Sequence, residues 1–193
     1  SPSVTGAYRF VITPGDDTTV EVTMRLFLRK DIKQLGIAPL TSMFLHNGAD
    51  KGSFDDFRPS VHDSEVLVLN AGKDATLCRP LNNPPRLASS YFGAQSPRSF
   101  GLAQRNRDFE HYLDAQAHYE RRPSLMIEPM GDWGKGTVRL VEIPSDLEGN
   151  DNIVAYWIPE GETRAGDELA YDYRMHWGMN PPGATPQTLG RVV

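Results

Sequence analysis

The sequence is poor in cysteine and has no long hydrophobic run. Its one cysteine among 193 residues, Cys78, excludes an internal disulfide framework but does not identify a cellular compartment. No stretch of about 18 apolar residues is present, so the sequence predicts no membrane-spanning helix. No secretory signal is expected within the sequence as given, which opens with Ser-Pro-Ser-Val rather than Met and alternates like a strand from residue 7. We therefore expect a mature protein or a piece of a longer one, whose ends indicate no location.

Basic residues are also scarce. Lysine and arginine total 20 against 25 aspartate and glutamate residues, which gives a net charge of −5 and a pI near 5.5. The broad positive surface with which proteins attract nucleic acids is therefore not expected.

Several catalytic and metal-binding motifs are missing as well. The five histidines show no His-x₃-His spacing, and Cys78 has no partner for a zinc site. The acidic segment 146–152 lacks the ligand order of an EF-hand. There is no Gly-x-Ser-x-Gly elbow, and Gly134-Lys-Gly-Thr137 lacks the first glycine of a P-loop. The sequence therefore predicts no bound metal and no cofactor.

What the sequence has in abundance is hydrophobic alternation of period two. Alternate residues from Val20 to Leu28 are apolar, with mostly polar residues between them, as in a half-buried antiparallel strand. The 15 prolines and 17 glycines supply turns, and no segment carries a clean helical stripe. These features favour a single all-β sandwich over residues 1–177.

The alternation and the turn residues predict the order of the elements. Strands are expected at 7–12, 18–28, 40–46, 65–70, 75–79, 86–93, 99–104, 124–130, 136–143, 153–157 and 168–177. One helical turn is expected at 31–36, with Asp31 as its cap and Gly36 as its stop. Residues 106–122 are expected to form a long, partly ordered loop over the sheet. Residues 178–193, with Pro181-Pro182-Gly183, are expected to form an exit linker.

Charged residues gather in the segment 55–65, directly before a strand. A solvated charge run is the ordinary explanation of such a cluster. Here the charges are interleaved with Phe57, Pro59 and Val61, and polar groups on a stiff loop at the mouth of a strand are placed as site residues often are. A functional site is favoured over a well-bonded structural loop, and both remain open at this point.

Two carboxylates stand in polar loops shortly before strands, Asp63 and Asp151. If neighbouring strands bring the two loops to one rim, the pair meets the need of glycosidic bond hydrolysis, in which one carboxyl protonates the leaving oxygen and the other activates water. Aromatic residues that suit sugar rings are frequent near these loops, although Trp157 is better explained as a core residue. Any single aspartate is more often structural than catalytic.

Eight strings of the sequence resemble the periplasmic glucan biosynthesis proteins, types G and D, in the same order along the chain. The strings are Ala38–Phe44, Asp56–Ser64, Arg79–Pro84, Phe100–Phe109, Tyr119–Ser124, Gly131–Gly136, Val141–Pro144 and Asn150–Trp157. The resemblance implies a periplasmic location and a fold of the galactose-mutarotase-like β-sandwich type. It further implies that this chain is the C-terminal part of the family's large domain, followed by a linker towards an immunoglobulin-like domain that is absent here.

The resemblance also implies a function and the residues that carry it. Family members act in the synthesis of osmoregulated periplasmic glucans, with a β-1,2-linked backbone, and include inverting β-1,2-glucanases. By resemblance, Asp151 matches the general acid, Asp63 the base, and Tyr119 a tyrosine that lines the reacting site. Arg58, His62, Arg79 and Asn152 are further candidates for substrate contact or support, and Arg58 or Arg79 is expected to keep Asp63 ionised. The alternatives are a glucan-binding or scaffolding protein of the same pathway and a calcium-dependent lectin. A homodimer is possible in either case.

Overall fold

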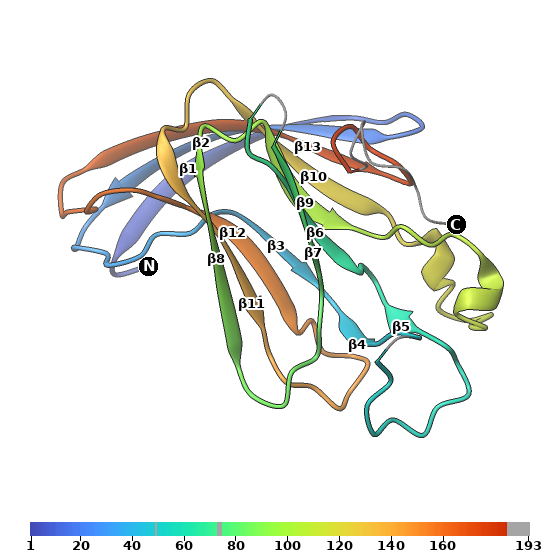
Figure 1. Cartoon of the computed structure of the whole chain (residues 1–193). Coiled ribbons are helices and arrows are strands. Elements are labelled where there is room, and N and C mark those ends of the chain that lie inside the picture. The colour runs from blue at the N-terminus through green and yellow to red at the C-terminus, as the bar shows by residue number, and fades with distance from the viewer. Residues whose placement is uncertain (49, 73–74, 185–193) are drawn as a thin grey trace.

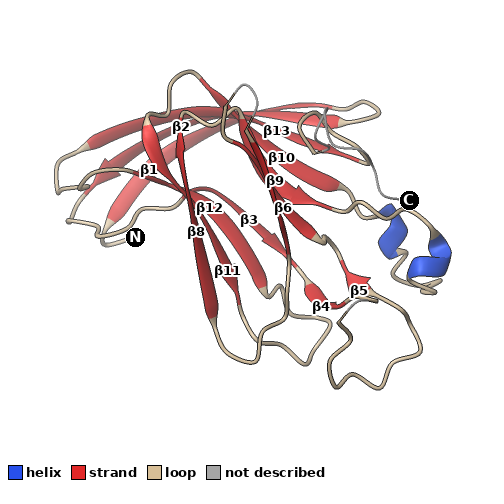
Figure 2. Cartoon of the chain, viewed as in Figure 1, coloured by secondary structure: helices blue, strands red, loops and turns tan. Residues whose placement is uncertain are grey.

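The computed structural model describes residues 1–48, 50–72 and 75–184 and shows an all-β protein. Strands form nearly all of the regular structure, and no α-helix occurs among the described residues (Figure 2). The strands are β1 (Val4–Thr13), β2 (Thr18–Leu28), β3 (Ile37–Ser42), β4 (Phe44–His46), β5 (Val61–His62), β6 (Val66–Asn70), β7 (Thr76–Pro80), β8 (Ala88–Gln95), β9 (Ser99–Ala103), β10 (Ser124–Met130), β11 (Lys135–Glu142), β12 (Ile153–Pro159) and β13 (Glu168–Gly178). Two short 3₁₀ helices, η1 (Phe109–His111) and η2 (Tyr119–Arg121), complete the set.

The strands form two principal antiparallel sheets that pack as a sandwich. The seven-stranded sheet has the order β1-β2-β13-β10-β9-β6-β7, and the four-stranded sheet has the order β3-β12-β11-β8. The strands of the second sheet run down to the end of the molecule where β4 and β5 form a two-stranded sheet (Figure 1). This result confirms the all-β sandwich. The finer galactose-mutarotase-like classification remains a prediction.

The core lies between the two sheets, where the period-two alternation places the apolar side chains. On β2, Val22, Met24, Leu26 and Leu28 are buried and belong to one cluster with residues of β11 and β12. Trp157 of β12 has no exposed surface, so its interpretation as a core residue is confirmed. Each such side chain stabilises the fold by roughly 1.5–3 kcal/mol when it leaves water.

The expected helical turn at 31–36 is wrong. Ile32 instead forms an isolated antiparallel bridge with Thr163. The Asp31 carboxylate accepts the backbone N–H of Ala165 at 2.8 Å, so its capping capacity serves a neighbouring loop. A single helical turn has little stability of its own, and tertiary contacts decide its conformation.

The strand expected at 40–46 is interrupted at Met43. Residues up to Ser42 pair with β12, whereas β4 pairs with β5. At the break, the Met43 carbonyl accepts the backbone N–H of Asp63 at 2.9 Å. Because of this interruption, the chain leaves the four-stranded sheet and pairs through β4 with the segment that contains the charge cluster predicted from the sequence.

Residues 106–122 are more ordered than the expected loop. They contain η1 and η2, and the rings of Tyr112 and Tyr119 are buried in a second, smaller cluster together with residues of β4 and β5. Leu113 and His118 have positive φ angles of 54° and 50°, which make the tight turns between the short helices possible. Without a continuous apolar stripe, periodicity gives no signal for such a segment.

The end of the described chain lies against the seven-stranded sheet. Ala184 is buried with Val66, Val68 and Met126, and the Asn70 side chain donates to the Gly183 carbonyl at 3.0 Å. Residues 185–193 of the expected linker lie outside the described residues, so the linker remains a prediction. Within the described part of the chain, no helix is long and apolar enough to cross a membrane.

Candidate functional site

Three loops meet at the end of the four-stranded sheet nearest β4 and β5. They are the loop that leads into β5, the η1–η2 segment, and the 143–152 loop that joins β11 to β12. Figure 1 shows the first two on the same side of the molecule. Side-chain hydrogen bonds from Arg58 to Asp114 and Glu148 tie all three loops together.

Arg58 is the centre of this connection. Its guanidinium donates to Asp56 at 2.7 Å, to Asp114 at 2.6 Å and to Glu148 at 2.8 Å. Hydrogen bonds to Glu148 and Asp56 raise the pKa of Arg58, and the guanidinium lowers the pKa of Asp56 to about 2. A planar fork with five donors suits such a cluster of carboxylates. Arg58 thus holds the loops in place, and its donors are engaged by the protein itself.

Glu148 connects this cluster to Tyr119. Its Oε1 accepts hydrogen bonds from the Tyr119 hydroxyl and from Arg58. The hydrogen bond from Arg58 lowers the pKa of Glu148, whereas burial and the hydrogen bond to Glu148 raise the pKa of Tyr119. The phenol therefore keeps its proton and directs it towards an ionised carboxylate.

Asp63 follows β5 directly and is partly buried beside these residues. Burial raises the pKa of its carboxyl group, Arg122 lowers it, and the negative charges of Asp151 and Glu148 raise it further. The three carboxylates are therefore close enough to interact electrostatically, although their sequence positions span two distant loops.

The cation at Asp63 is Arg122 rather than the expected Arg58 or Arg79. Arg122 Nε lies 3.1 Å from Asp63 Oδ1, and its guanidinium carbon lies 5.5 Å from the centre of the Tyr119 ring. Among the described residues, nothing donates a hydrogen bond to the buried Oδ1. Arg122 therefore interacts with Asp63 through its charge and not through a hydrogen bond. Asp63 Oδ1 keeps its capacity to accept a proton or a hydrogen bond.

Asp151 is exposed, and the neighbouring Asn152 fixes its backbone. The Asn152 amide nitrogen donates to the carbonyls of Phe44 at 2.9 Å and Ile143 at 3.1 Å. Its oxygen accepts the Phe44 backbone N–H at 2.8 Å. Asn152 is only 2% exposed, so its position is that of an anchor for the loop and not of a group open to a ligand.

His62 has no exposed surface. Its Nδ1 lies 2.8 Å from Gln104 Oε1, and its ring stacks on Phe44 with the centroids 5.3 Å apart. Burial lowers the pKa of His62 to about 4, so the ring is neutral at physiological pH. Two roles were expected for His62, substrate contact or support of the site. Its buried position favours support of the neighbouring Asp63.

Arg79 lies on β7 and forms an ion pair with Glu142 at 2.8 Å. Glu142, at the end of β11, is buried and also accepts the backbone N–H of Asn82 at 2.7 Å. This pair joins the edge of one sheet to the other. Arg79 is therefore engaged away from Asp63, and its substrate contact remains a prediction.

Sequence reasoning missed Arg122, Asp114 and Gln104 as parts of this site. Arg122 stands in the string Tyr119–Ser124 that carried the resemblance, but a lone arginine in that string gives no sign of its partner. Asp114 lies in the segment expected to be a loop, where no periodicity indicates a position. Within the described residues, no group of three or more His, Cys, Asp or Glu side chains is arranged to hold a metal ion.

Comparison with known proteins gives a consistent match over the whole sequence. Residues 1–193 match the family described as "Periplasmic glucan biosynthesis protein, MdoG". The chain is 62% identical over 181 residues to a protein named glucans biosynthesis protein G from Cereibacter sphaeroides, covering 94% of this chain and 34% of that protein.

Proteins of the same name from other bacteria are also similar. The identity is 52% over 193 residues for Pseudomonas putida, with 100% of this chain and 33% of the relative covered. It is 52% over 181 residues for Shewanella frigidimarina, with 94% and 32% covered. The chain thus spans about a third of the length of these relatives. It belongs to the periplasmic glucan biosynthesis protein family, MdoG.

Proposed function

We propose that the protein to which this chain belongs hydrolyses β-1,2-linked glucan with inversion of configuration. Membership of the family implies a role in glucan biosynthesis and a periplasmic location. In our proposal Asp151 is the general acid and Asp63 is the base that activates water, and Tyr119 lines the reacting site. The observation that carries the proposal is the Asp63 carboxylate, which is partly buried, paired with Arg122 and subject to the negative charge of Asp151.

The surroundings of Asp63 suit a general base. A raised pKa makes a carboxylate a stronger base, as long as the group stays ionised at the working pH. Burial and the nearby negative charges raise the pKa of Asp63, while Arg122 favours its ionised form. The Asp63 side chain remains 29% exposed, so its carboxylate can accept a proton from water, directly or through a substrate hydroxyl.

The exposed position of Asp151 suits a group that must reach the leaving oxygen of a bound chain. In inverting hydrolysis one carboxylic acid protonates this oxygen while water attacks from the opposite face of the sugar, and the carboxyl groups stand about 6.5–9.5 Å apart. A larger separation is compatible with a proton relay.

The substitution Asp151→Asn tests the proposal in the full-length protein. It removes the proton donor and keeps the side-chain volume, so turnover of linear β-1,2-glucan should fall by about 10²–10⁴-fold. Release of reducing ends is the measurement, and circular dichroism checks that the variant is folded. Unchanged turnover would exclude Asp151 as the acid, and NMR detection of a retained anomer in the first product would exclude inversion.

A second candidate function is binding or scaffolding of glucan without hydrolysis. The name of the relatives refers to glucan biosynthesis and not to hydrolysis, and much of the acidic cluster is engaged by Arg58. Calorimetry with β-1,2-glucan oligomers distinguishes the two functions. Binding without any product over a long incubation would favour the second, as calcium-dependent binding lost on chelation would favour a lectin.

A further inference from the structure

The outward face of the four-stranded sheet carries two tyrosines on either side of an arginine. Arg139 of β11 is paired across the sheet with Tyr91 of β8 and with Tyr156 of β12. Alternate residues of all three strands face the core, so these three side chains lie together on the opposite surface. We refer to Tyr91, Arg139 and Tyr156 as the tyrosine–arginine row.

The row is held in a defined geometry. The Arg139 guanidinium carbon lies 5.2 Å from the centre of the Tyr91 ring and 5.9 Å from that of Tyr156. Its nitrogens donate to Gln34 at 2.6 Å, to the Tyr156 hydroxyl at 3.0 Å and to Ser89 at 2.9 Å. The side chain is thus fixed before any ligand arrives, which lowers the entropic cost of binding.

The two tyrosines differ in what covers them. The Tyr156 ring lies against Gly36, where an added Cβ would come within 2.8 Å of the ring. Tyr91 stands on the edge strand and is 53% exposed. Among the described residues, Arg139 Nε is buried and has no hydrogen-bond partner. The row therefore presents one open aromatic ring beside an immobilised cation.

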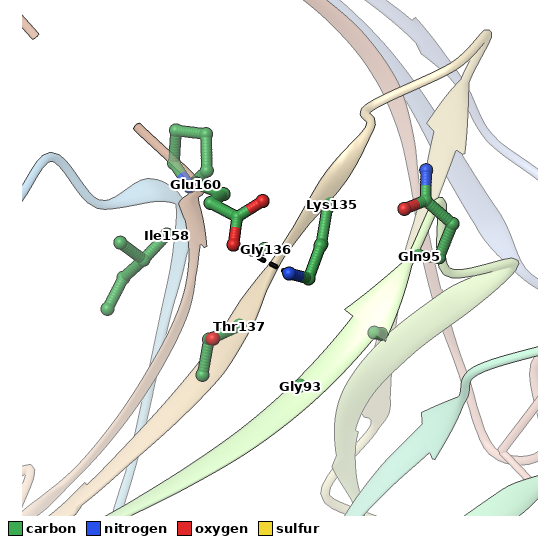
Figure 3. Close-up of a pocket in the computed structure, with 9 residues that line it drawn as sticks. Gly93, Gln95, Lys135, Gly136, Thr137, Ile158 and Glu160 are labelled. Carbon is green, nitrogen blue, oxygen red and sulfur yellow. Dashed lines mark hydrogen bonds and ion pairs between the residues drawn. The ribbon is translucent and has the colours of Figure 1, made fainter. Parts of the chain in front are cut away.

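A hollow adjoins the row on the next rung of the same sheet. Thr137 is paired there with Gly93 and with Ile158, and the absence of a side chain at Gly93 leaves space beside the strand. The Lys135–Glu160 ion pair of 2.8 Å borders the hollow. Figure 3 shows Thr137 and Ile158 beside this ion pair, with Gly93 on the neighbouring strand.

The chemistry of this surface suits an uncharged, polyhydroxylated ligand. An exposed aromatic ring packs against the apolar face of a sugar, and the neighbouring guanidinium, amide and hydroxyl groups provide hydrogen bonds to hydroxyls. The Lys135–Glu160 pair leaves the hollow itself without net charge, and the one positive charge beside it, that of Arg139, is directed at the neutral groups of Gln34, Tyr156 and Ser89. A chain of glucose units meets each of these requirements.

The row and the acidic site belong to the same hairpin. The 143–152 loop carries Glu148 and Asp151 and joins β11 to β12, whose outward residues form the row and the hollow. Tyr156 is five residues beyond Asp151, which corresponds to about 17 Å along an extended strand. We propose that this outward face is a second glucan-binding site that holds a distant part of the chain being processed at Asp151. The inference rests on the proposed function for the identity of the sugar.

The substitution Tyr91→Ala in the full-length protein tests the inference with linear β-1,2-glucans of graded length. Affinity measured by calorimetry should fall about tenfold for long chains, in line with the loss of one aromatic contact. Affinity for chains too short to span from Asp151 to Tyr91 should not change. Tyr8→Ala is the matched control, because Tyr8 lies on the other sheet's edge strand β1 and is 50% exposed.

The outcomes separate this inference from the proposed function. Equal affinity of Tyr91→Ala and the unmodified protein at every chain length would overturn the second site, even if Asp151→Asn abolishes hydrolysis. A length-dependent loss in Tyr91→Ala would support the site, even if no hydrolysis is found. Absence of any glucan binding by the unmodified protein, or an equal loss in Tyr8→Ala, would also overturn it.

Discussion

At the scale of single residues, the charged groups of the site differ in burial and in the charges that surround them. Arg58 lies among three carboxylates and neutralises only part of their charge. Asp63 is paired with Arg122, yet its pKa is raised by burial and by the charges of Asp151 and Glu148. Burial and like charges thus oppose the effect of Arg122 on Asp63, so its protonation depends on the other charges of the cluster.

The substitution Glu148→Gln should change the pH dependence of hydrolysis. Removing the negative charge of Glu148 lowers the pKa of Asp63, because that charge favours the protonated form. A base must be ionised, so the acidic limb of the kcat/KM profile should move to lower pH. Glu162→Gln is the control, since Glu162 is exposed, forms an ion pair with Arg164 between β12 and β13, and belongs to neither proposed site. An acidic limb that stays in place or moves to higher pH would contradict the assigned role of Asp63.

At the scale of elements, loops and strand interruptions position the site. After the break at Met43 the chain enters β4, which pairs with β5. Asn152 bonds both backbone groups of Phe44 just after the break. The 143–152 loop is thereby attached to the start of β4. Few of these features can be predicted from the sequence. Hydrophobic alternation indicates which face of a strand is buried, but it does not indicate where the strand stops pairing with its sheet.

The substitution Asn152→Ala should destabilise this part of the fold. It leaves the buried backbone N–H and carbonyl of Phe44 without partners, at a cost of about 1–3 kcal/mol each when they remain unsatisfied. Denaturant unfolding measures the effect. Asn150→Ala is the control: Asn150 is exposed and donates to the Ser145 hydroxyl, so its loss should change stability by less than about 0.5 kcal/mol. Equal effects of the two substitutions would contradict the anchoring role.

At the scale of the whole molecule, two antiparallel sheets enclose one main core, and ionisable groups buried in the protein link its stability to pH. His62 is the clearest case, since it lies wholly inside and burial lowers its pKa to about 4. In the unfolded chain the same ring titrates near its ordinary value of about 6.5. Below that pH the unfolded state binds a proton that the folded state does not, so acid favours unfolding.

The contribution of His62 to the free energy of unfolding should therefore be complete above about pH 6.5 and should be lost as the pH falls to about 4. The integrated loss is about 3 kcal/mol. Denaturant unfolding at a series of pH values, compared with the same series for His62→Gln, isolates this contribution from those of other groups. Parallel stability curves for the two proteins would show that His62 is not the group responsible.

The amino-acid sequence by itself determined the sandwich, most of its strands and the interior place of Trp157. Hydrophobic alternation of period two and turn residues are local features of the sequence. They are sufficient to predict a strand, because a strand requires only one apolar face that can be buried. The resemblance indicated the family, which the comparisons show, and the candidate pair Asp63 and Asp151, whose roles remain proposals.

Only the tertiary structure decided which groups meet at the site. It assigned Arg122 to Asp63, engaged Arg58 with partners as far as 90 positions away, and placed His62 inside the protein. The physical reason is that these contacts join loops, whose conformations follow from the packing of the strands between them and not from local propensity.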